Sequence, residues 1–252
     1  MKAYGIIPAR FYSTRLEGKP LVDLVGKPMI QRVYERASLA ASLSSLIVAT
    51  DDERILKKVI EFGGEAILTS SLHQSGTDRI AEVVRKKDYK NSDIIVNIQG
   101  DQPVIEPRII DKAVSMFEKS AALNMVTLAV PIKEGADSIN PNIVKVVMDD
   151  EGFALYFSRS PIPYFRGQVN RPIYYKHIGL YAYRKEFLLK FAALPKGKLE
   201  MAESLEQLRA LENGFRIKVA LIDFDSVEVD TPEDLGKVKK FIEKGNLNVP
   251  IV

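Results

Sequence analysis

The stretch YGIIPARFYSTRLEGKPL (residues 4–21) decides how the rest of the sequence is interpreted. It opens with a short apolar run and continues into a loop that carries Arg10, Arg15 and Lys19 within ten residues. In open α/β sheets, ligands bind at the carboxyl ends of the strands, which is where this loop would lie. A strand followed by a basic loop therefore predicts a ligand-binding edge of an α/β sheet.

Beyond this stretch, short runs rich in Ile and Val alternate with amphipathic segments. The alternation is typical of βαβ units around a largely parallel sheet that helices cover on both faces. We therefore predict an α/β fold with a doubly wound, Rossmann-like mixed sheet. In the first part we expect strands at residues 4–7, 46–49, 66–68 and 93–98. We expect three helices there: one that begins at residues 26–28, one at residues 52–62 and one at residues 77–86.

From about residue 143 the pattern changes. Residues 144–148 and 153–157 flank an Asp-Asp-Glu-Gly turn, which predicts a β-hairpin. Residues 158–174 contain three prolines and form one long loop, a candidate lid over a site. The other elements expected here are a strand at residues 175–183, a helix at 201–213, a strand at 217–224 and a last helix with Thr231 as its N-cap.

The composition limits the chemistry. The chain has no cysteine and only His73 and His177, so disulfides, thiolate nucleophiles and Cys/His zinc sites are excluded, and any metal must bind oxygen ligands. The net charge is +3, and Lys and Arg are interspersed with Asp and Glu along the chain. This pattern does not indicate binding of nucleic acid. The first residues lack the apolar core and the small-residue cleavage site of a signal peptide, so we expect none, and no apolar run approaches the roughly 20 residues that span a bilayer. We expect a cytoplasmic protein that does not bind a membrane.

The cations of the basic loop suit a triphosphate. Each can donate a charge-assisted hydrogen bond to a phosphate oxygen while negative charge moves onto a departing pyrophosphate. Arginine makes bidentate contacts and lysine acts as a point charge. The loop lacks both the Walker spacing GxxxxGK[ST] and the GxGxxG motif, so it does not predict an ordinary ATPase or dinucleotide site. Composition alone equally allows a solvated loop in which charges cluster by chance.

Two carboxylates are candidate magnesium ligands. Asp101 follows an apolar run and Gly100, so we expect it at the same sheet edge as the basic loop. Asp230 lies between an expected strand and the last helix. Mg²⁺ typically takes one or two carboxylates and fills its other positions with water and phosphate oxygens. The alternatives are that Asp101 is a turn residue and that Asp230 only starts a helix.

Several motifs in a fixed order give the sequence a resemblance to a known family. From the first strand to VDTPEDL (residues 229–235), essentially the whole chain resembles the 3-deoxy-manno-octulosonate cytidylyltransferases, or CMP-Kdo synthetases. The other motifs that carry the resemblance are IIPARFYSTRLEGKPL (6–21), HQSGTDR (73–79), NIQGDQP (97–103), YFSRSPIP (156–163), KHIGLYAYR (176–184) and LEQLR (205–209).

This resemblance implies an activity. CMP would be transferred from CTP to an acidic eight-carbon sugar, 3-deoxy-manno-octulosonate (Kdo), with Mg²⁺ as cofactor and release of pyrophosphate, for lipopolysaccharide synthesis. It also implies a homodimer and a fold like that of the nucleotide-diphospho-sugar transferases. We take residues 1–252 as a single domain, in which about residues 1–130 bind CTP, about residues 131–225 bind the sugar and form the dimer, and residues 226–252 return to the core.

The resemblance also implies roles for individual residues. The implied catalytic residues are Arg10, Lys19 and Asp101, and the implied metal ligands are Asp101 and Asp230. The implied nucleotide-binding residues are Pro8, Ala9, Arg10, Ser13, Arg15, Lys19, Arg79 and Gln99. The implied sugar-binding residues are Arg159, His177, Tyr181, Glu206 and Gln207.

The chemistry of the sugar-binding set agrees with its implied role. Arg159 can pair with a sugar carboxylate, and the other four side chains can bind hydroxyls. Each also has a plainer interpretation. Glu206 and Gln207 lie off the leucine stripe of their expected helix and equally suit a position that faces solvent. His177 and Tyr181 share one face of a strand, which fits a pocket lining and ordinary packing equally well.

The sequence departs from the family at one position. The family usually has QGDEP where this chain has QGDQP (residues 99–103), so the neutral Gln102 replaces a carboxylate beside Asp101. The departure bears on metal affinity and substrate choice. Four alternatives stay open: the same reaction on 8-amino-Kdo, the same reaction on sialic acid, a non-catalytic CTP-sensing module and a glycosyltransferase on a similar sheet. The basic loop together with both aspartates favours the enzyme.

Overall fold

A computed structural model describes residues 1–12, 16–133, 135–167, 172–225 and 227–245. Ser13 and Arg15, which were predicted to bind the nucleotide, lie outside the described residues, and so does part of the candidate lid at residues 158–174. Within the described ranges, no helix is both long and apolar enough to cross a membrane.

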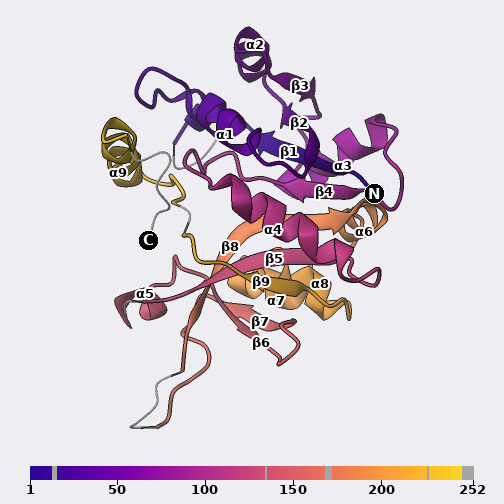
Figure 1. Cartoon of the computed structure of the whole chain (residues 1–252), viewed down its shortest axis with the longest axis vertical. Coiled ribbons are helices and arrows are strands. Elements are labelled where there is room, and N and C mark those ends of the chain that lie inside the picture. Colours follow the sequence, from indigo (N-terminus) through magenta and orange to yellow (C-terminus); the bar gives the residue numbers. More distant parts are fainter. Residues whose placement is uncertain (13–15, 134, 168–171, 226, 246–252) are drawn as a thin grey trace.

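The described strands join in one sheet (Figure 1). The strands are β1 (Ala3–Ala9), β2 (Leu43–Thr50), β3 (Glu65–Leu68), β4 (Ile94–Asn97), β5 (Met125–Pro131), β6 (Lys145–Met148), β7 (Ala154–Ser158), β8 (Tyr175–Arg184) and β9 (Lys218–Leu221). The helices are α1 (Met29–Ala37), α2 (Glu53–Glu61), α3 (Gly76–Lys86), α4 (Pro107–Glu118), α5 (Gly135–Ile139), α6 (Lys185–Ala192), α7 (Lys198–Glu203), α8 (Leu208–Glu212) and α9 (Pro232–Glu243), with a short 3₁₀ turn η1 (Lys19–Leu21).

The sheet is mixed, as expected. Its main order is β3-β2-β1-β4-β8-β5-β9, and β6 extends from β8 and pairs with β7. Strands β3, β2, β1 and β4 run parallel to one another, whereas β8 runs antiparallel to both β4 and β5. The antiparallel strand β8 therefore lies inside the sheet. On one side of it are the parallel strands β3, β2, β1 and β4, and on the other side are β5 and β9.

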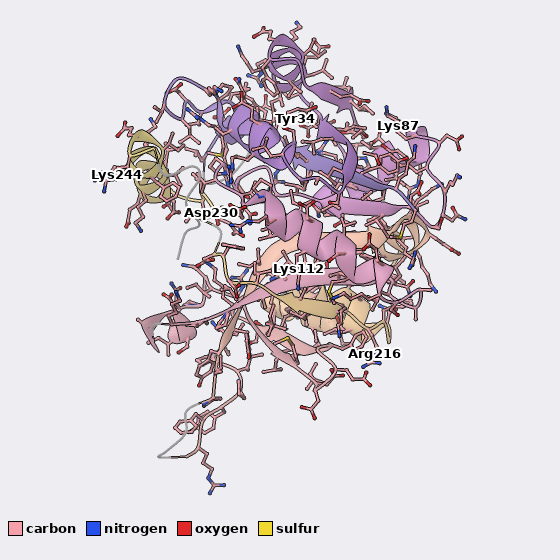
Figure 2. The ribbon with its side chains drawn as sticks, in the orientation of Figure 1. Tyr34, Lys87, Lys112, Arg216, Asp230 and Lys244 are labelled. Atoms are coloured by element: carbon pink, nitrogen blue, oxygen red, sulfur yellow. The ribbon has the colours of Figure 1, made fainter. Side chains whose placement is uncertain are left out.

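Helices cover both faces of the sheet, so the doubly wound prediction is confirmed (Figure 1). Successive residues of β1 point to opposite faces: Ile7 belongs to the apolar cluster that includes α1, α2 and α4, and Ile6 belongs to the cluster that includes α3, α6 and α8. Side chains fill the space between these layers (Figure 2). Both faces of β1 and β4 are largely buried, which explains why these two strands read as continuous apolar runs.

A smaller apolar cluster attaches α9 to this core. Leu24 and Met29 from the region before and at the start of α1 pack with Val229, Val238 and Ile242. Helix α9 begins as predicted, because the Thr231 side chain accepts a hydrogen bond from the fourth residue of the capping box at 3.2 Å. This packing places the segment before α9 next to the loops of the first strands.

The hairpin prediction is confirmed, since β6 pairs antiparallel with β7. Other elements differ from the sequence prediction in three ways. Strand β9 is shorter than the predicted 217–224, and β5, α4, α5 and α6 were not predicted. The predicted helix 201–213 is wrong: it is two short helices, α7 and α8, because Ser204 adopts a left-handed conformation with φ of 54° and the chain turns there.

Candidate active site

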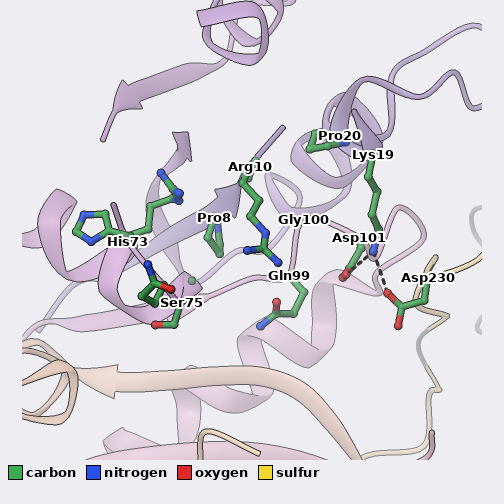
Figure 3. A pocket seen from close by; sticks show the side chains of 14 residues that line it. Pro8, Arg10, Lys19, Pro20, His73, Ser75, Gln99, Gly100, Asp101 and Asp230 are labelled. Carbon is green, nitrogen blue, oxygen red and sulfur yellow. Dashed lines mark hydrogen bonds and ion pairs between the residues drawn. The ribbon is translucent and has the colours of Figure 1, made fainter. Parts of the chain in front are cut away.

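A cavity of about 260 Å³ opens beside the carboxyl ends of β1 and β4 and the first turn of α3 (Figure 3). This is where an open α/β sheet binds its ligands. The segments around it are far apart in the sequence, and their lining residues are Pro8, Ala9, Arg10, Lys19, Pro20, His73, Gln74, Ser75, Gly76, Arg79, Gln99, Gly100, Asp101 and Asp230. Every described residue that was predicted to bind nucleotide or metal is in this lining.

Lys19 lies between the two carboxylates that were predicted to hold metal (Figure 3). Its Nζ is 2.8 Å from Asp101 Oδ2 and 3.1 Å from Asp230 Oδ1. The main chain supports the same arrangement, because the Val229 N–H donates to the Asp101 carbonyl at 2.9 Å. One cation is thus within ion-pair distance of both carboxylates.

A glycine is required at residue 100. A Cβ at this position would lie 2.9 Å from the carbonyl oxygen of Pro8, closer than real Cβ contacts come. The close approach packs the turn after β4 against the end of β1. Asp101 is thereby brought to the basic loop, while Arg10 extends into the cavity toward Gln99 (Figure 3).

The basic loop is anchored at Phe11. The Arg54 guanidinium lies 3.4 Å from the Phe11 ring centroid, and Asp52 holds it with two hydrogen bonds of 2.9 and 2.7 Å. The returning end of the loop is tied to the same residue, since the Gly18 N–H donates to the Phe11 carbonyl at 2.9 Å. With φ of 65°, Gly18 has a backbone that favours glycine.

Arg79 lines the cavity, but most of its donors are occupied by the protein. It is buried, and its Nη2 donates to Asp51 Oδ2 at 2.7 Å. Its Nη1 donates to Thr69 Oγ1 at 2.6 Å and to the Ser70 carbonyl at 3.3 Å. These partners follow β2 and β3, so Arg79 fixes the ends of two strands at the cavity wall.

His73, which the sequence analysis assigned no role, also lines the cavity. Its Nε2 contacts the Glu82 carboxylate. Desolvation raises the pKa of Glu82, but hydrogen bonds from Lys86, the Ser70 N–H and His73 outweigh it and hold the pKa at about 2. The signal was present in the sequence, because His73 opens the motif HQSGTDR, whose last four residues, from Gly76, form the start of α3.

The five predicted sugar-binding residues, here called the inner polar group, lie outside the cavity lining. They come from β8, from the segment after β7 and from the turn between α7 and α8. Glu206 links this group to the cavity wall, since Thr77 Oγ1 donates to Glu206 Oε2 at 2.5 Å and Thr77 follows the lining residue Gly76. Burial raises the pKa of Glu206, against the opposing effect of the Thr77 hydrogen bond.

Gln207 has an unsatisfied donor. The residue is 4% exposed, and its Nε2 has no hydrogen-bond partner among the described residues. The alternative that Gln207 faces solvent is therefore wrong, because the break at Ser204 turns it inward. Buried polar groups are normally hydrogen-bonded, so a free amide at this position is suited to a polar ligand.

His177 and Tyr181 point into the same interior face of β8, with ring centroids 5.4 Å apart. Burial lowers the pKa of His177 to about 3, so its imidazole is neutral. Its Nε2 lies 2.9 Å from Thr127 Oγ1, which also donates to the Leu180 carbonyl at 2.9 Å. A hydroxyl has one proton, so the imidazole carries its own proton on Nε2 and leaves Nδ1 as an acceptor. Burial raises the pKa of Tyr181 well above its usual value.

Arg159 is held in a frame of backbone contacts. Its Nε donates to the Glu203 carbonyl at 2.8 Å and its Nη1 to the Pro141 carbonyl at 3.0 Å. The Glu203 carboxylate accepts from the Arg159 N–H at 2.9 Å. The buried Lys145 ammonium donates to the Arg159 carbonyl at 2.6 Å. Contacts with Pro141, Lys145 and Glu203 thus position Arg159.

Gln99 joins the cavity to the inner polar group. It lines the cavity, and its Nε2 donates to the Gly179 carbonyl at 2.9 Å, between His177 and Tyr181 on β8. The antiparallel position of β8 next to β4 creates this link, which no spacing in the sequence indicates.

Comparison with known proteins assigns the chain to a family. The family described as cytidylyltransferase matches residues 4–219. The chain belongs to the cytidylyltransferase family. It is 54% identical to the 3-deoxy-manno-octulosonate cytidylyltransferase of Geotalea uraniireducens (strain Rf4), over 97% of this chain and 100% of the relative. It is 51% identical to the 8-amino-3,8-dideoxy-manno-octulosonate cytidylyltransferase of Shewanella sp. (strain ANA-3), over 93% of this chain and 96% of the relative.

Solved structures agree with this assignment. This cytidylyltransferase is similar to a CMP:2-keto-3-deoxy-manno-octonic acid synthetase in complex with CTP, with a TM-score of 0.92, 45% identity and coverage of 97% of this chain and 100% of that chain. A 4-diphosphocytidyl-2C-methyl-D-erythritol synthase from Anaerococcus prevotii, at 15% identity and a TM-score of 0.62, shares the fold. The predicted fold class and nucleotidyltransferase activity are confirmed.

The donor set of this cytidylyltransferase fits a magnesium ion. Asp101 and Asp230 converge on one cationic atom, Lys19 Nζ, and Mg²⁺ typically binds one or two protein carboxylates. Within the part of the chain that the structure describes, no group of three or more His, Asp or Glu residues converges on a metal position. A metal at this site would complete its coordination with water and phosphate oxygens.

Proposed function

We propose that this cytidylyltransferase transfers CMP from CTP to 3-deoxy-manno-octulosonate and releases pyrophosphate. The observation that carries the proposal is the Lys19 ammonium between Asp101 and Asp230 in a cavity that Arg10 also enters. This places cationic and carboxylate groups together at a ligand-binding sheet edge. The names of the similar proteins indicate the substrates that we propose, a cytidine nucleotide and the sugar.

The reaction is an in-line displacement at phosphorus. The anomeric 2-hydroxyl oxygen of the sugar bonds to the α-phosphorus of CTP, the bond from that phosphorus to the bridging oxygen breaks, and pyrophosphate takes the electron pair. Arg10 and Lys19 stabilise the negative charge that grows on the pyrophosphate. The hydroxyl proton goes to water, since the phosphate loop has no histidine and burial lowers the pKa of His177 to about 3, which makes its imidazole a weak base.

Magnesium is the proposed cofactor, with Asp101 and Asp230 as its protein ligands. The ion would neutralise phosphate charge and orient the reacting groups. Because Lys19 pairs with both carboxylates in this structure, we expect its ammonium to move from them to a phosphate oxygen when the site is loaded. Lys19 would then serve the leaving group, and the carboxylates would be available to the metal.

The inner polar group is the proposed sugar site. Gln207 offers a buried Nε2 donor that has no partner among the described residues, Glu206 a carboxylate held by Thr77, and His177 a neutral acceptor at Nδ1. Arg159, fixed by Glu203, supplies the positive charge for the sugar carboxylate. Gln99 connects these residues to the nucleotide cavity, as a shared reaction centre requires.

Three further expectations belong to this proposal. The product would serve lipopolysaccharide assembly, the protein would act in the cytoplasm, and two copies would form a homodimer. The second candidate substrate is the 8-amino analogue of Kdo, because the relative from Shewanella is named for that sugar at 51% identity. The two sugars differ in a hydroxyl and an amine at one carbon, a difference that only a few contacts in a pocket would detect.

The test is pyrophosphate release from CTP and Mg²⁺ with Kdo, 8-amino-Kdo and sialic acid measured side by side. We expect release with Kdo and its loss in Asp101→Asn. Preference for another sugar would keep the chemistry and change the substrate. CTP binding without release for any sugar would refute the proposed reaction and favour a CTP-sensing module, whereas consumption of a nucleotide sugar would favour a glycosyltransferase.

A further inference from the structure

Lys145, which the sequence analysis placed in a strand without a role, is fully buried. It is the first residue of β6, and its Nζ donates to three main-chain carbonyls. The carbonyl of Asn140 accepts at 2.9 Å, and those of Ile143 and Arg159 each accept at 2.6 Å. An ammonium has three protons, so each carbonyl receives one. A neutral amine has only two, and the geometry therefore requires the charged form.

Stability alone does not explain a lysine at this position. An ammonium that leaves water loses solvation free energy, which hydrogen bonds have to offset. Well-packed apolar residues are often as stabilising as buried charged groups. What the ammonium of Lys145 adds is convergence: it draws together carbonyls from two segments, residues 140–143 and residue 159, that lie on either side of the β6–β7 hairpin.

The same two segments hold the Arg159 side chain. Its Nη1 donates to the Pro141 carbonyl at 3.0 Å, and Pro141 lies between the two residues of its segment whose carbonyls Lys145 binds. The third carbonyl that Lys145 binds belongs to Arg159 itself. Lys145 therefore fixes the acceptor at Pro141 relative to the main chain that carries the guanidinium. The Nε bond to the Glu203 carbonyl, at 2.8 Å, gives the guanidinium a second fixed point.

This frame leaves part of the Arg159 guanidinium available to a ligand. The guanidinium has five N–H donors, and the bonds to Pro141 and Glu203 use two of them. The remaining donors at Nη1 and Nη2 suit a carboxylate, which a guanidinium binds through two parallel hydrogen bonds. A side chain that is fixed before the ligand arrives loses less conformational entropy on binding. The support of Arg159 should therefore appear in the affinity for an anionic ligand.

We propose that Lys145 is a positioning residue for the acidic sugar: by binding the carbonyls of residues 140, 143 and 159, it orients the Arg159 guanidinium and so raises the affinity for the sugar carboxylate. The inference rests on the proposed function, in which Arg159 pairs with that carboxylate. Neither residue lines the nucleotide cavity, so the effect should fall on the sugar and not on CTP.

The test is the KM for Kdo and the KM for CTP, measured by pyrophosphate release at a temperature where thermal unfolding shows each variant to be folded. Lys145→Met removes all three donors, so we expect the KM for Kdo to rise about tenfold, while the KM for CTP stays within about twofold of wild type. The kcat at saturating sugar should stay within about threefold. Lys145→Gln keeps two N–H donors, and its KM for Kdo should rise only about threefold.

A double-mutant cycle shows whether the effect passes through Arg159. Arg159→Met should raise the KM for Kdo about 10²-fold, and adding Lys145→Met should then change it by less than about twofold. Lys145→Gln replaces Lys145→Met in the cycle if the latter does not fold. The positioning role is refuted if the Lys145 effect persists without Arg159, if the KM for CTP rises as much as that for Kdo, or if neither KM changes. Unfolding of both Lys145 variants would assign the residue to the fold as a whole and would also overturn the inference.

The matched control is Lys185→Met. Lys185 also donates to a main-chain carbonyl, that of Tyr89, but it follows the last residue of β8, whereas Lys145 pairs with the start of that strand. Both KM values should stay within about twofold of wild type, and a rise in the KM for Kdo equal to that of Lys145→Met would refute the specific role. An Arg159→Met variant with an unchanged KM for Kdo would refute the sugar site of the proposed function and the inference with it. An effect of Arg159→Met without one of Lys145→Met would refute the inference alone.

Discussion

The nucleotide cavity and the inner polar group lie next to each other but are built differently. In the cavity, the charged groups pair with one another: Lys19 bridges Asp101 and Asp230, and each of the three side chains keeps some access to solvent. In the inner polar group, the side chains are held by residues that have no proposed contact with substrate, such as Thr77 for Glu206 and Thr127 for His177.

The difference has an energetic consequence. A partly exposed ion pair contributes little to folding, because water solvates its charges almost as well. A buried charge that loses its partner costs several kcal/mol. Substitutions in the cavity should therefore change activity more than stability, whereas substitutions in the support of the inner polar group should change both.

The largest expected effect is on activity, in Lys19→Met. Loss of the ammonium removes one charge that stabilises the leaving group, which costs about 10²- to 10³-fold in kcat. The melting temperature should stay within about 3 °C of wild type, since the ion pairs are partly exposed. Pyrophosphate release and thermal unfolding measure the two quantities. A fall in stability as large as the fall in activity would remove the contrast between the two regions.

The next effect is on stability, in Arg209→Met. Arg209 donates two hydrogen bonds to Glu200, at 2.7 and 2.6 Å, and both side chains are buried. The variant leaves the Glu200 charge unpaired, so we expect a loss of about 3 to 5 kcal/mol in the free energy of unfolding and a melting temperature lower by about 10 °C. Denaturant and thermal unfolding measure these changes.

Two controls sharpen the Arg209 result. Arg216→Met removes an arginine that is 58% exposed and lies at the periphery, far from Asp230 (Figure 2), and its melting temperature should change by less than about 2 °C. Adding Glu200→Leu to Arg209→Met removes both charges and should recover much of the lost stability. Arg209 Nη2 also lies 3.5 Å from Glu206 Oε1, which connects the buried pair to the inner polar group. If Arg209→Met unfolds like Arg216→Met, the buried pair does not support this group.

The smallest effect is the pH dependence that His177 contributes. Its pKa is about 3 in the folded state, below the usual value, so only the unfolded state gains a proton as the pH falls through about 6.5. The stability that the neutral His177 contributes is fully present above about pH 6.5 and is lost as the pH falls toward about 3. Between pH 7 and pH 5, the free energy of unfolding of wild type should drop by about 2 kcal/mol more than that of His177→Gln.

Denaturant unfolding of both proteins at several pH values checks this expectation. Equal pH dependence in wild type and His177→Gln would mean that His177 titrates normally and is solvated in the folded protein. The same variant tests the reaction. If it abolished turnover while the affinities for CTP and sugar were unchanged, His177 would be the base, and the transfer of the hydroxyl proton to water would be wrong.

The sequence predicted the nucleotide cavity better than the inner polar group. The cavity was predictable, because its residues belong to short motifs at the ends of apolar strands, and the carboxyl ends of parallel strands meet at one edge. Asp101 and Lys19 were placed there from the sequence, and both line the cavity. The alternative that the loop charges cluster by chance does not account for the contact of Lys19 with both aspartates.

The inner polar group was less predictable. Its residues were named by resemblance, but their surroundings depend on partners far away in the chain. The helix prediction failed at Ser204 because the leucine spacing continues through a turn whose left-handed backbone leaves no sign in the hydrophobic pattern. Gln207 was therefore assigned an alternative position in solvent, although the turn buries it.

The sequence by itself determined the doubly wound α/β sheet, the oxygen-ligand chemistry and the basic loop, because hydrophobic period, composition and local motifs are properties of short stretches of chain. Only the tertiary structure decided that β8 inserts beside β4, that Lys19 bridges Asp101 and Asp230, and that Gln102 faces Glu228. These contacts join residues many tens of positions apart. They form when the apolar faces of the whole sheet are buried together, and no local pattern specifies which polar side chains then meet.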